Sequence, residues 1–124
     1  MDIKELLENT KARKDFLANL NSIDIDSELE SIIDLLVETR KLSYKLGDEK
    51  IRIWKSHPQM LPNDPLYRRS LKIDVMVSRL SSIYSAVLDH LEQNLLEKDL
   101  SNVLNTVNLR VEEAKKTDTN RRVQ

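Results

Sequence analysis

The chain has 124 residues, with 20 basic and 21 acidic side chains, a formal net charge of −1, one glycine and no cysteine. This length and balance fit a single soluble domain, and the scarcity of glycine excludes glycine-rich phosphate loops and dinucleotide-binding motifs, which need close backbone approach. Without cysteine the chain has no disulfide framework, no thiolate metal site and no cysteine nucleophile.

The first half of the sequence predicts two helices separated by a polar turn. Apolar residues recur at helical spacing over residues 2–20, and Asn, Ser and Asp then dominate residues 21–26, where their side chains compete with helical hydrogen bonds. Ser27 and the glutamate three positions later match a capping box, which predicts the start of a second helix that extends to about Ser56. Gly47 interrupts the apolar pattern and marks either a kink or a C-terminal cap followed by a restart at Asp48, and we favour one kinked helix.

A proline-rich segment separates the second helix from a third. Three prolines fall within residues 57–65, and none of them fits a helix interior. Asp64 followed by Pro65 predicts a helix start, because the Asp side chain can accept from first-turn amides and a proline there has no amide to leave unpaired. The apolar positions that follow alternate steps of four and three, the spacing of a stripe buried against a neighbouring helix. The stripe consists of Ile73, Val77, Leu80, Tyr84, Val87 and Leu91.

The apolar stripe changes phase after Leu91, which predicts a turn followed by a further helix. Continuing the spacing would place only polar residues on the stripe. A new stripe comprises Leu96, Leu100, Val103, Val107, Val111 and Ala114. We place the turn near Lys98, with Asp99 as a candidate cap. Residues 117–124 have no periodic apolar positions and are predicted to form a disordered C-terminal tail.

These elements predict an all-α fold. We expect a single helical domain over residues 1–116, built as an antiparallel bundle of three to four helices. The long second and third helices would form a hairpin across the proline segment.

Charge is unevenly distributed along the chain. Residues 1–39 carry 4 basic and 10 acidic side chains, residues 40–79 carry 10 and 4, and residues 80–124 carry 6 and 7. In the hairpin arrangement, the basic segment surrounds the proline loop from both sides.

The tip of the hairpin is the predicted partner-binding surface. Tryptophan, tyrosine and arginine are enriched at binding hot spots, and a loop stiffened by prolines loses less entropy on binding. The candidate residues are Lys50, Arg52, Trp54, Lys55, Met60, Leu61, Tyr67, Arg68, Arg69 and Lys72. The alternative is that Trp54 and Tyr67 close the end of the bundle and that the basic side chains pair with the acidic N-terminal segment.

One short motif suggests catalysis. Arg52 is followed five positions later by His57, and this spacing resembles the R-x4-6-H signature of the HEPN superfamily of all-helical domains, many of which are metal-independent ribonucleases that act as dimers. The resemblance implies that Arg52 would bind phosphate and that His57 would handle a proton. The family usually has a polar residue directly after the arginine, where this chain has Ile53.

The remaining polar residues predict no cofactor and no metal site. His57 and His90 are far apart in the sequence, neither belongs to a helical metal-binding motif, and His90 is expected at the surface or the edge of a stripe. Nucleic acid is an alternative partner, because the basic tip and its two aromatic residues could engage phosphates and stack bases. The slightly negative net charge disfavours it.

The sequence therefore favours a non-enzymatic helical module for protein–protein interaction, such as an adaptor or a small subunit of a larger assembly. The helical segments offer more apolar stripe than one thin bundle readily buries, and a protein partner or a second copy of the chain would cover the excess. No apolar run is long enough to span a membrane, and the charged first five residues do not fit a secretory signal. We thus expect no membrane contact and a cytoplasmic or nuclear location.

Overall fold

The computed structural model of the chain is an all-α bundle, as the sequence predicts. It describes the backbone of residues 2–123 and the side chains of residues 2–117, and no strand occurs within these residues. The elements in chain order are α1 (Ile3–Glu8), α2 (Thr10–Asn19), the short 3-10 helix η1 (Leu20–Ser22), α3 (Ile25–Ser56), α4 (Pro65–Asn94) and α5 (Glu97–Val123).

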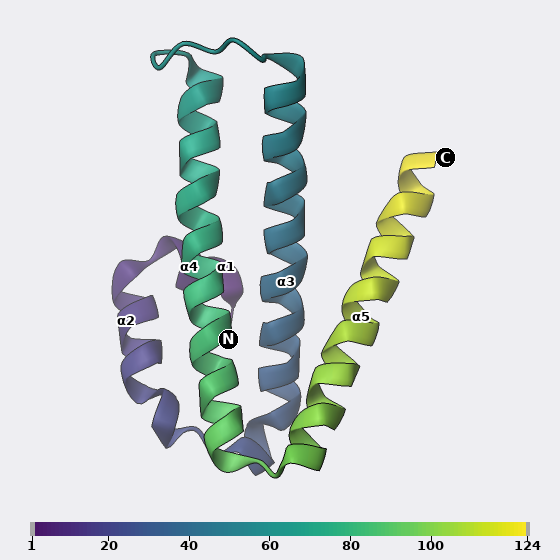
Figure 1. Cartoon of the computed structure of the whole chain (residues 1–124). Helices are drawn as coiled ribbons and strands as arrows, with labels where there is room; N and C mark the ends of the chain where they lie inside the picture. The colour runs from purple at the N-terminus through teal and green to yellow at the C-terminus, as the bar shows by residue number, and fades with distance from the viewer. Residues whose placement is uncertain (1, 124) are drawn as a thin grey trace.

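The two longest helices, α3 and α4, form the predicted antiparallel hairpin (Figure 1). The Asp64 side chain accepts a hydrogen bond of 2.8 Å from the backbone N–H of Leu66, and Pro65 opens α4, which confirms the predicted start. Four members of the predicted α4 stripe are fully buried, and the other two, Val77 and Tyr84, are half-buried. The buried members are Ile73, Leu80, Val87 and Leu91.

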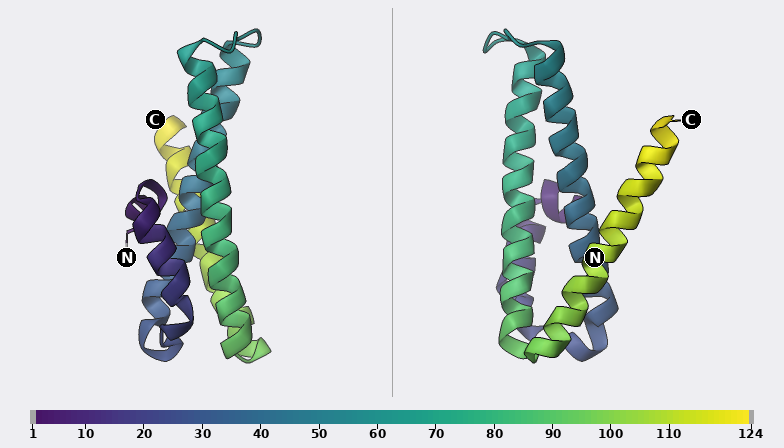
Figure 2. Two further views of the ribbon diagram at one scale, coloured as in Figure 1. Left: turned by 90° about the vertical axis from the view of Figure 1, so that its left-hand side faces the viewer. Right: turned by 45° about the vertical axis from the view of Figure 1, so that its right-hand side comes forward.

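The N-terminal segment departs from the single helix predicted over residues 2–20. Asn9 has extended backbone angles, φ −105° and ψ 107°, and its side chain accepts a 3.0 Å bond from the Ala12 N–H, so a new helix begins there. Arg13 then donates to the carbonyl oxygens of Leu6 and Leu7 at 3.1 and 3.2 Å. These bonds join α2 to the end of α1, and the two short helices pack on one side of the hairpin near its open end (Figure 2).

The start of α3 also differs from the prediction. Asp24 caps the helix by accepting a 3.1 Å bond from the Asp26 N–H, and the hydroxyl of Ser27 donates to the second carboxylate oxygen of Asp24 at 3.0 Å. The capping box assigned to Ser27 is therefore wrong, because a better acceptor lies three residues earlier. The helix continues through Gly47 to Ser56, the end that the sequence predicts.

The turn between α4 and α5 falls at Leu95 and Leu96, before the predicted position at Lys98. Leu95 ends α4, because its backbone is extended, with φ −111° and ψ 148°, and its N–H donates to the carbonyl oxygen of Leu91. The side-chain amide of Asn94 donates to the carbonyl oxygen of His90 at 2.8 Å. His90 itself is only 4% exposed, with Nε2 at 3.2 Å from the carbonyl oxygen of Ile23. Of the two positions expected for His90, the surface and the edge of a stripe, the surface is therefore wrong.

The new stripe of α5 is covered by this chain, mainly by α3. Val103, Val107 and Val111 are buried, whereas Leu96 is 77% exposed at the turn. Most of this stripe is thus not available to a partner. The helix extends beyond residue 116 to Val123, while the side chains of residues 118–124 lie outside those that the structure describes.

The hairpin extends beyond the other helices. The pair α1 and α2 lies beside the half nearest the open end, and α5 diverges from α3 towards its own C-terminus (Figures 1 and 2). The loop end of the hairpin is therefore mostly a two-helix structure. We call residues 45–75, which comprise the end of α3, the loop and the start of α4, the arm.

Candidate functional site

All ten predicted partner-binding residues lie in the arm. Four are on the last turns of α3, two are in the loop, and four are on the first turns of α4. The hairpin therefore brings together residues that are up to 22 positions apart in the sequence. The structure divides them into residues that hold the arm together and residues that face solvent.

Trp54 and Tyr67 belong mainly to the first group. The indole Nε1 of Trp54 donates to the Ser70 hydroxyl at 2.8 Å, and the two aromatic rings meet edge to face, with centroids 6.1 Å apart and planes at 76°. Both side chains are half-buried, and Ser70 is buried. The pair fastens α3 to α4 near the loop, which agrees with the alternative that these rings close the end of the bundle.

Two of the basic residues form ion pairs across the hairpin. Arg69 donates through Nε and an Nη to the two carboxylate oxygens of Glu49, at 2.8 and 2.9 Å, and this bidentate bond lowers the pKa of Glu49. Lys50 pairs with Asp74. The expectation that basic residues of the tip pair with the acidic N-terminal segment is wrong for both, because their partners come from the hairpin itself.

The other four basic residues of the predicted set are exposed. Lys55, Arg68 and Lys72 form no ion pair within the part of the chain that the structure describes, and Arg52 donates to the backbone carbonyl of Asp48 at 3.4 Å. The arm as a whole has 7 basic and 4 acidic side chains. It therefore presents a positive surface around its neutralised pairs.

Exposed apolar side chains accompany these charges. Ile51 is 54% exposed, Leu71 49% and Val75 48%, and the loop residue Leu61 is 67% exposed. Leu71 and Val75 are one helical turn apart on α4 and so share a face. Leu61 was predicted as a loop residue of the tip, but the other three were missed, because they lie off the predicted stripes; their signal was the surplus of apolar positions on α3 and α4.

Arg52 and His57, the pair that resembles the ribonuclease signature, are both exposed near the end of α3. The His57 backbone N–H donates to the carbonyl oxygen of Ile53 at 3.0 Å and closes the helix. Neither side chain lines the cavity between α3 and α4 or the smaller cavity beside η1. Among the described residues, no cluster of His, Asp or Glu side chains is arranged to hold a metal ion, and no described helix has the length and apolar character of a membrane span.

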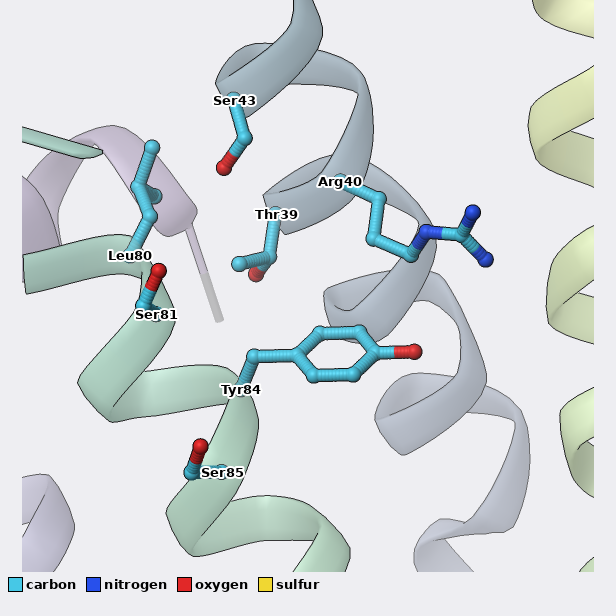
Figure 3. A pocket seen from close by; sticks show the side chains of 7 residues that line it. All are labelled: Thr39, Arg40, Ser43, Leu80, Ser81, Tyr84 and Ser85. Carbon is cyan, nitrogen blue, oxygen red and sulfur yellow. The ribbon is translucent and has the colours of Figure 1, made fainter. Parts of the chain in front are cut away.

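A cavity of about 420 Å³ lies between α3 and α4 outside the predicted site (Figure 3). Five of its seven lining residues carry a hydroxyl group. The lining consists of Thr39, Arg40, Ser43, Leu80, Ser81, Tyr84 and Ser85. The sequence signal for it was the spacing of four between Thr39 and Ser43 on one helix and between Ser81 and Ser85 on the next, but only the register of the hairpin brings the two pairs together. A second cavity of about 40 Å³ lies among α2, η1, α3 and α4 and is lined mainly by apolar side chains.

At the edge of the larger cavity, Arg40 links α3 to α5. Its guanidinium donates to the side-chain oxygen of Asn108 and, at 3.1 Å, to the hydroxyl of Tyr44. The bond with Tyr44 raises the pKa of Arg40 and lowers that of the phenol. Lys115 of α5 lies over the same ring, with Nζ 3.7 Å from its centroid. Two cations therefore converge on one tyrosine.

Comparisons of the chain with protein-family models, with curated proteins and with solved structures find no match. The chemistry of the arm and of the cavity is therefore what supports a function for this chain.

Proposed function

We propose that the chain is a non-enzymatic helical module that binds an acidic protein partner through the arm. The observation that carries the proposal is the concentration of exposed apolar side chains there. Seven large apolar residues of the described chain are exposed, and four of them lie in the arm. These four are Ile51, Leu61, Leu71 and Val75. Exposed apolar groups beside unpaired charge are typical of interaction surfaces.

Charge supports an acidic partner. Arg68 lies three positions before Leu71, and Lys72 lies three positions before Val75, so each exposed apolar side chain has a cation one helical turn away. Cations in these positions steer an acidic surface to the arm and speed association. The ion pairs of Arg69 and Lys50 instead hold the two helices in register, so the arm meets its partner as a preformed surface.

Nucleic acid is less well supported. Base stacking needs exposed aromatic faces, whereas Trp54 and Tyr67 contact each other and are half-buried. A ribonuclease would in addition need a substrate pocket around Arg52 and His57, and the cavities described above lie elsewhere. Protein binding requires neither feature.

The experiment compares capture from a native lysate by the wild-type chain and by two variants. Leu71→Asp with Val75→Asp places charge on the exposed apolar face of the arm. Leu109→Asp is the matched control, because Leu109 is 65% exposed on α5, outside the arm. We expect the wild type and the Leu109 variant to retain the same acidic protein and the double variant to lose it, with helical circular dichroism unchanged in all three.

Three results would contradict the proposal. The first is retention of the partner by the double variant, and the second is its equal loss in the Leu109 control. The third is capture of RNA in place of protein, especially if the pure chain cleaves single-stranded RNA without metal and His57→Ala abolishes that cleavage.

A further inference from the structure

The outer face of α4 in the arm carries two exposed apolar side chains. Ile73 is fully buried in the hairpin, and Leu71 and Val75 each lie two positions from it along the helix. Two positions correspond to a rotation of about 200°, so both side chains lie on the face opposite the buried one. Because they are four positions apart, they lie one turn above the other. The outer face of α4 therefore has an apolar strip that the described helices leave exposed.

Tyr67 extends this strip by one turn towards the loop. It lies four positions before Leu71, and its half-buried ring meets Trp54 edge to face on the α3 side. We call Tyr67, Leu71 and Val75 the α4 row. At a rise of about 1.5 Å per residue, the row is about 12 Å long. This length is two helical turns, which matches side chains spaced one turn apart on a partner helix.

The other helices of the chain stop short of the α4 row. Arg79, four positions after Val75, donates to the carbonyl oxygen of Leu7 at 3.3 Å, so the end of α1 lies beside the next turn of α4. Figure 2 shows α1 and α2 against the half of the hairpin nearest its open end, with the arm extending beyond them. A helix of this chain thus borders α4 next to the row, and no described helix covers the row itself.

Cations without ion pairs lie along one edge of the α4 row. Arg68 and Lys72 are four positions apart and exposed, and neither forms an ion pair within the described residues. Each directly follows a residue of the row, so both lie on the same side of it. On the other side, Asp74 pairs with Lys50. A partner that covers the row would therefore meet positive charge along one edge only.

Three other kinds of occupant suit this surface less well. An extended peptide that adds a strand needs a free sheet edge, and the described residues contain no strand. A polyproline segment needs a groove lined with aromatic rings, whereas Trp54 and Tyr67 pack on each other. The arm of a second copy would carry the same 7 basic and 4 acidic side chains, so two arms would repel each other. An amphipathic helix with acidic residues beside its apolar stripe meets none of these objections.

We propose that the partner binds the arm through an acidic amphipathic helix, which packs along the outer face of α4. The apolar stripe of this helix contacts the α4 row, and its acidic residues lie beside Arg68 and Lys72. The assignment rests on the proposed function and narrows it, because it places the contact on α4 alone. The exposed Ile51 of α3 lies outside the contact.

Titration of the full chain with synthetic peptides, followed by nuclear magnetic resonance, tests the proposal. The probe is a helical peptide of about 18 residues, with leucines one turn apart on one face and glutamates along one edge of that face. One comparison peptide has lysine in place of each edge glutamate, and the other has the composition of the probe with its leucines spread around the helix.

We expect saturable shifts over residues 67–75 with the acidic probe. Each comparison peptide should bind at least about tenfold more weakly, because one lacks the charge contacts and the other lacks the apolar stripe. Equal binding of either comparison peptide, or no saturation with the acidic probe, would overturn the proposal.

Two matched pairs of variants locate the contact. Lys72→Glu should weaken binding of the acidic probe about fivefold and strengthen that of the lysine peptide, whereas Lys55→Glu, the same change at an exposed position of α3, should alter neither. Leu71→Asp should abolish saturation by the acidic probe, and Ile51→Asp should leave it unchanged. Circular dichroism checks that each variant remains helical. An equal loss in Lys55→Glu or in Ile51→Asp would refute the assignment to α4.

The capture experiment separates this proposal from the proposed function. If the wild-type chain captures an acidic protein that the Leu71→Asp, Val75→Asp variant loses, but the acidic probe does not bind, the helix assignment is wrong and the proposed function stands. If the double variant retains the captured protein, the proposed function itself is wrong.

Discussion

Leu80 is fully buried at the centre of the α4 stripe, where the hairpin depends on close packing. Replacing it with alanine removes buried methyl groups and leaves a cavity, so Leu80→Ala should lower the free energy of unfolding by about 2 to 5 kcal/mol. Leu109→Ala, at an exposed position of α5, should change it by less than about 0.5 kcal/mol. Urea unfolding followed by circular dichroism measures both, and similar values for the two variants would contradict the packing described for α4.

Glu49 gives the arm a dependence on pH. Its hydrogen bonds with Arg69 lower its pKa in the folded chain, so the pair stabilises the fold fully above the ordinary pKa of glutamate, and this contribution disappears as pH falls through the lowered value. Both side chains are more than one-third exposed, and solvent therefore limits the effect to about 1 kcal/mol or less.

The variant Glu49→Gln isolates this contribution. We expect it to be less stable than the wild type at pH 7 and to approach the wild type as pH falls below the ordinary pKa of glutamate and through the lowered pKa of Glu49, where the native carboxylate also becomes protonated. Urea unfolding over a series of pH values from 7 downwards provides the measurement. A difference that stays constant or grows towards low pH would show that the Arg69 pair does not stabilise the arm.

Individual polar residues account for most of what sequence patterns could not predict. Asn9 and Asp24 each begin a helix through a side-chain hydrogen bond, at positions where several neighbouring residues could have formed a similar bond, and Leu95 ends α4 through an extended backbone. His90 is buried because the carbonyl oxygen of Ile23 lies within reach, which only the folded chain reveals. Asp64 and Pro65 were predictable because proline restricts the local backbone by itself.

At the scale of helices, Gly47 is the residue of α3 with the lowest helix propensity. It lies in the helix interior, and an added Cβ atom would meet no atom within 4 Å. Gly47→Ala should therefore stabilise the chain by about 0.5 to 1 kcal/mol, because alanine loses less backbone entropy in a helix. Thermal unfolding measures the change. A lower melting temperature would mean that α3 depends on a bend or a close contact at this position.

Helices were predicted best where apolar spacing alone determines them. The α4 stripe from Ile73 to Leu91 is buried as its spacing indicates, and α3 extends to Ser56 as predicted. The sequence predicted the apolar stripe of α5 but not that α3 covers it, since periodicity identifies a buried face without identifying the element that packs against it. Ion pairs also hold α5 against α3, because Arg110 of α5 lies 3.3 and 3.2 Å from carboxylate oxygens of Glu30 and Asp34 of α3.

At the scale of the whole molecule, the distribution of polar and apolar groups separates two regions. The half of the hairpin near α1, α2 and η1 contains much of the core, and the arm carries exposed apolar and basic side chains. The ten predicted site residues share one end of the molecule because the proline loop reverses the chain. Which of these residues form ion pairs and which stay exposed depends on which turn of α3 faces which turn of α4. The position of the cavity between the two helices depends on the same register, and one sequence does not reveal that register.

Hydrogen exchange tests most directly whether the arm is the partner-binding surface. Amide exchange is compared between the isolated wild-type chain and its complex with the protein that the wild type captures and the Leu71→Asp, Val75→Asp variant does not. We predict slower exchange on binding over residues 45–75 and little change in α1 and α2. Protection confined to α1, α2 or α5, with the arm unchanged, would contradict the account.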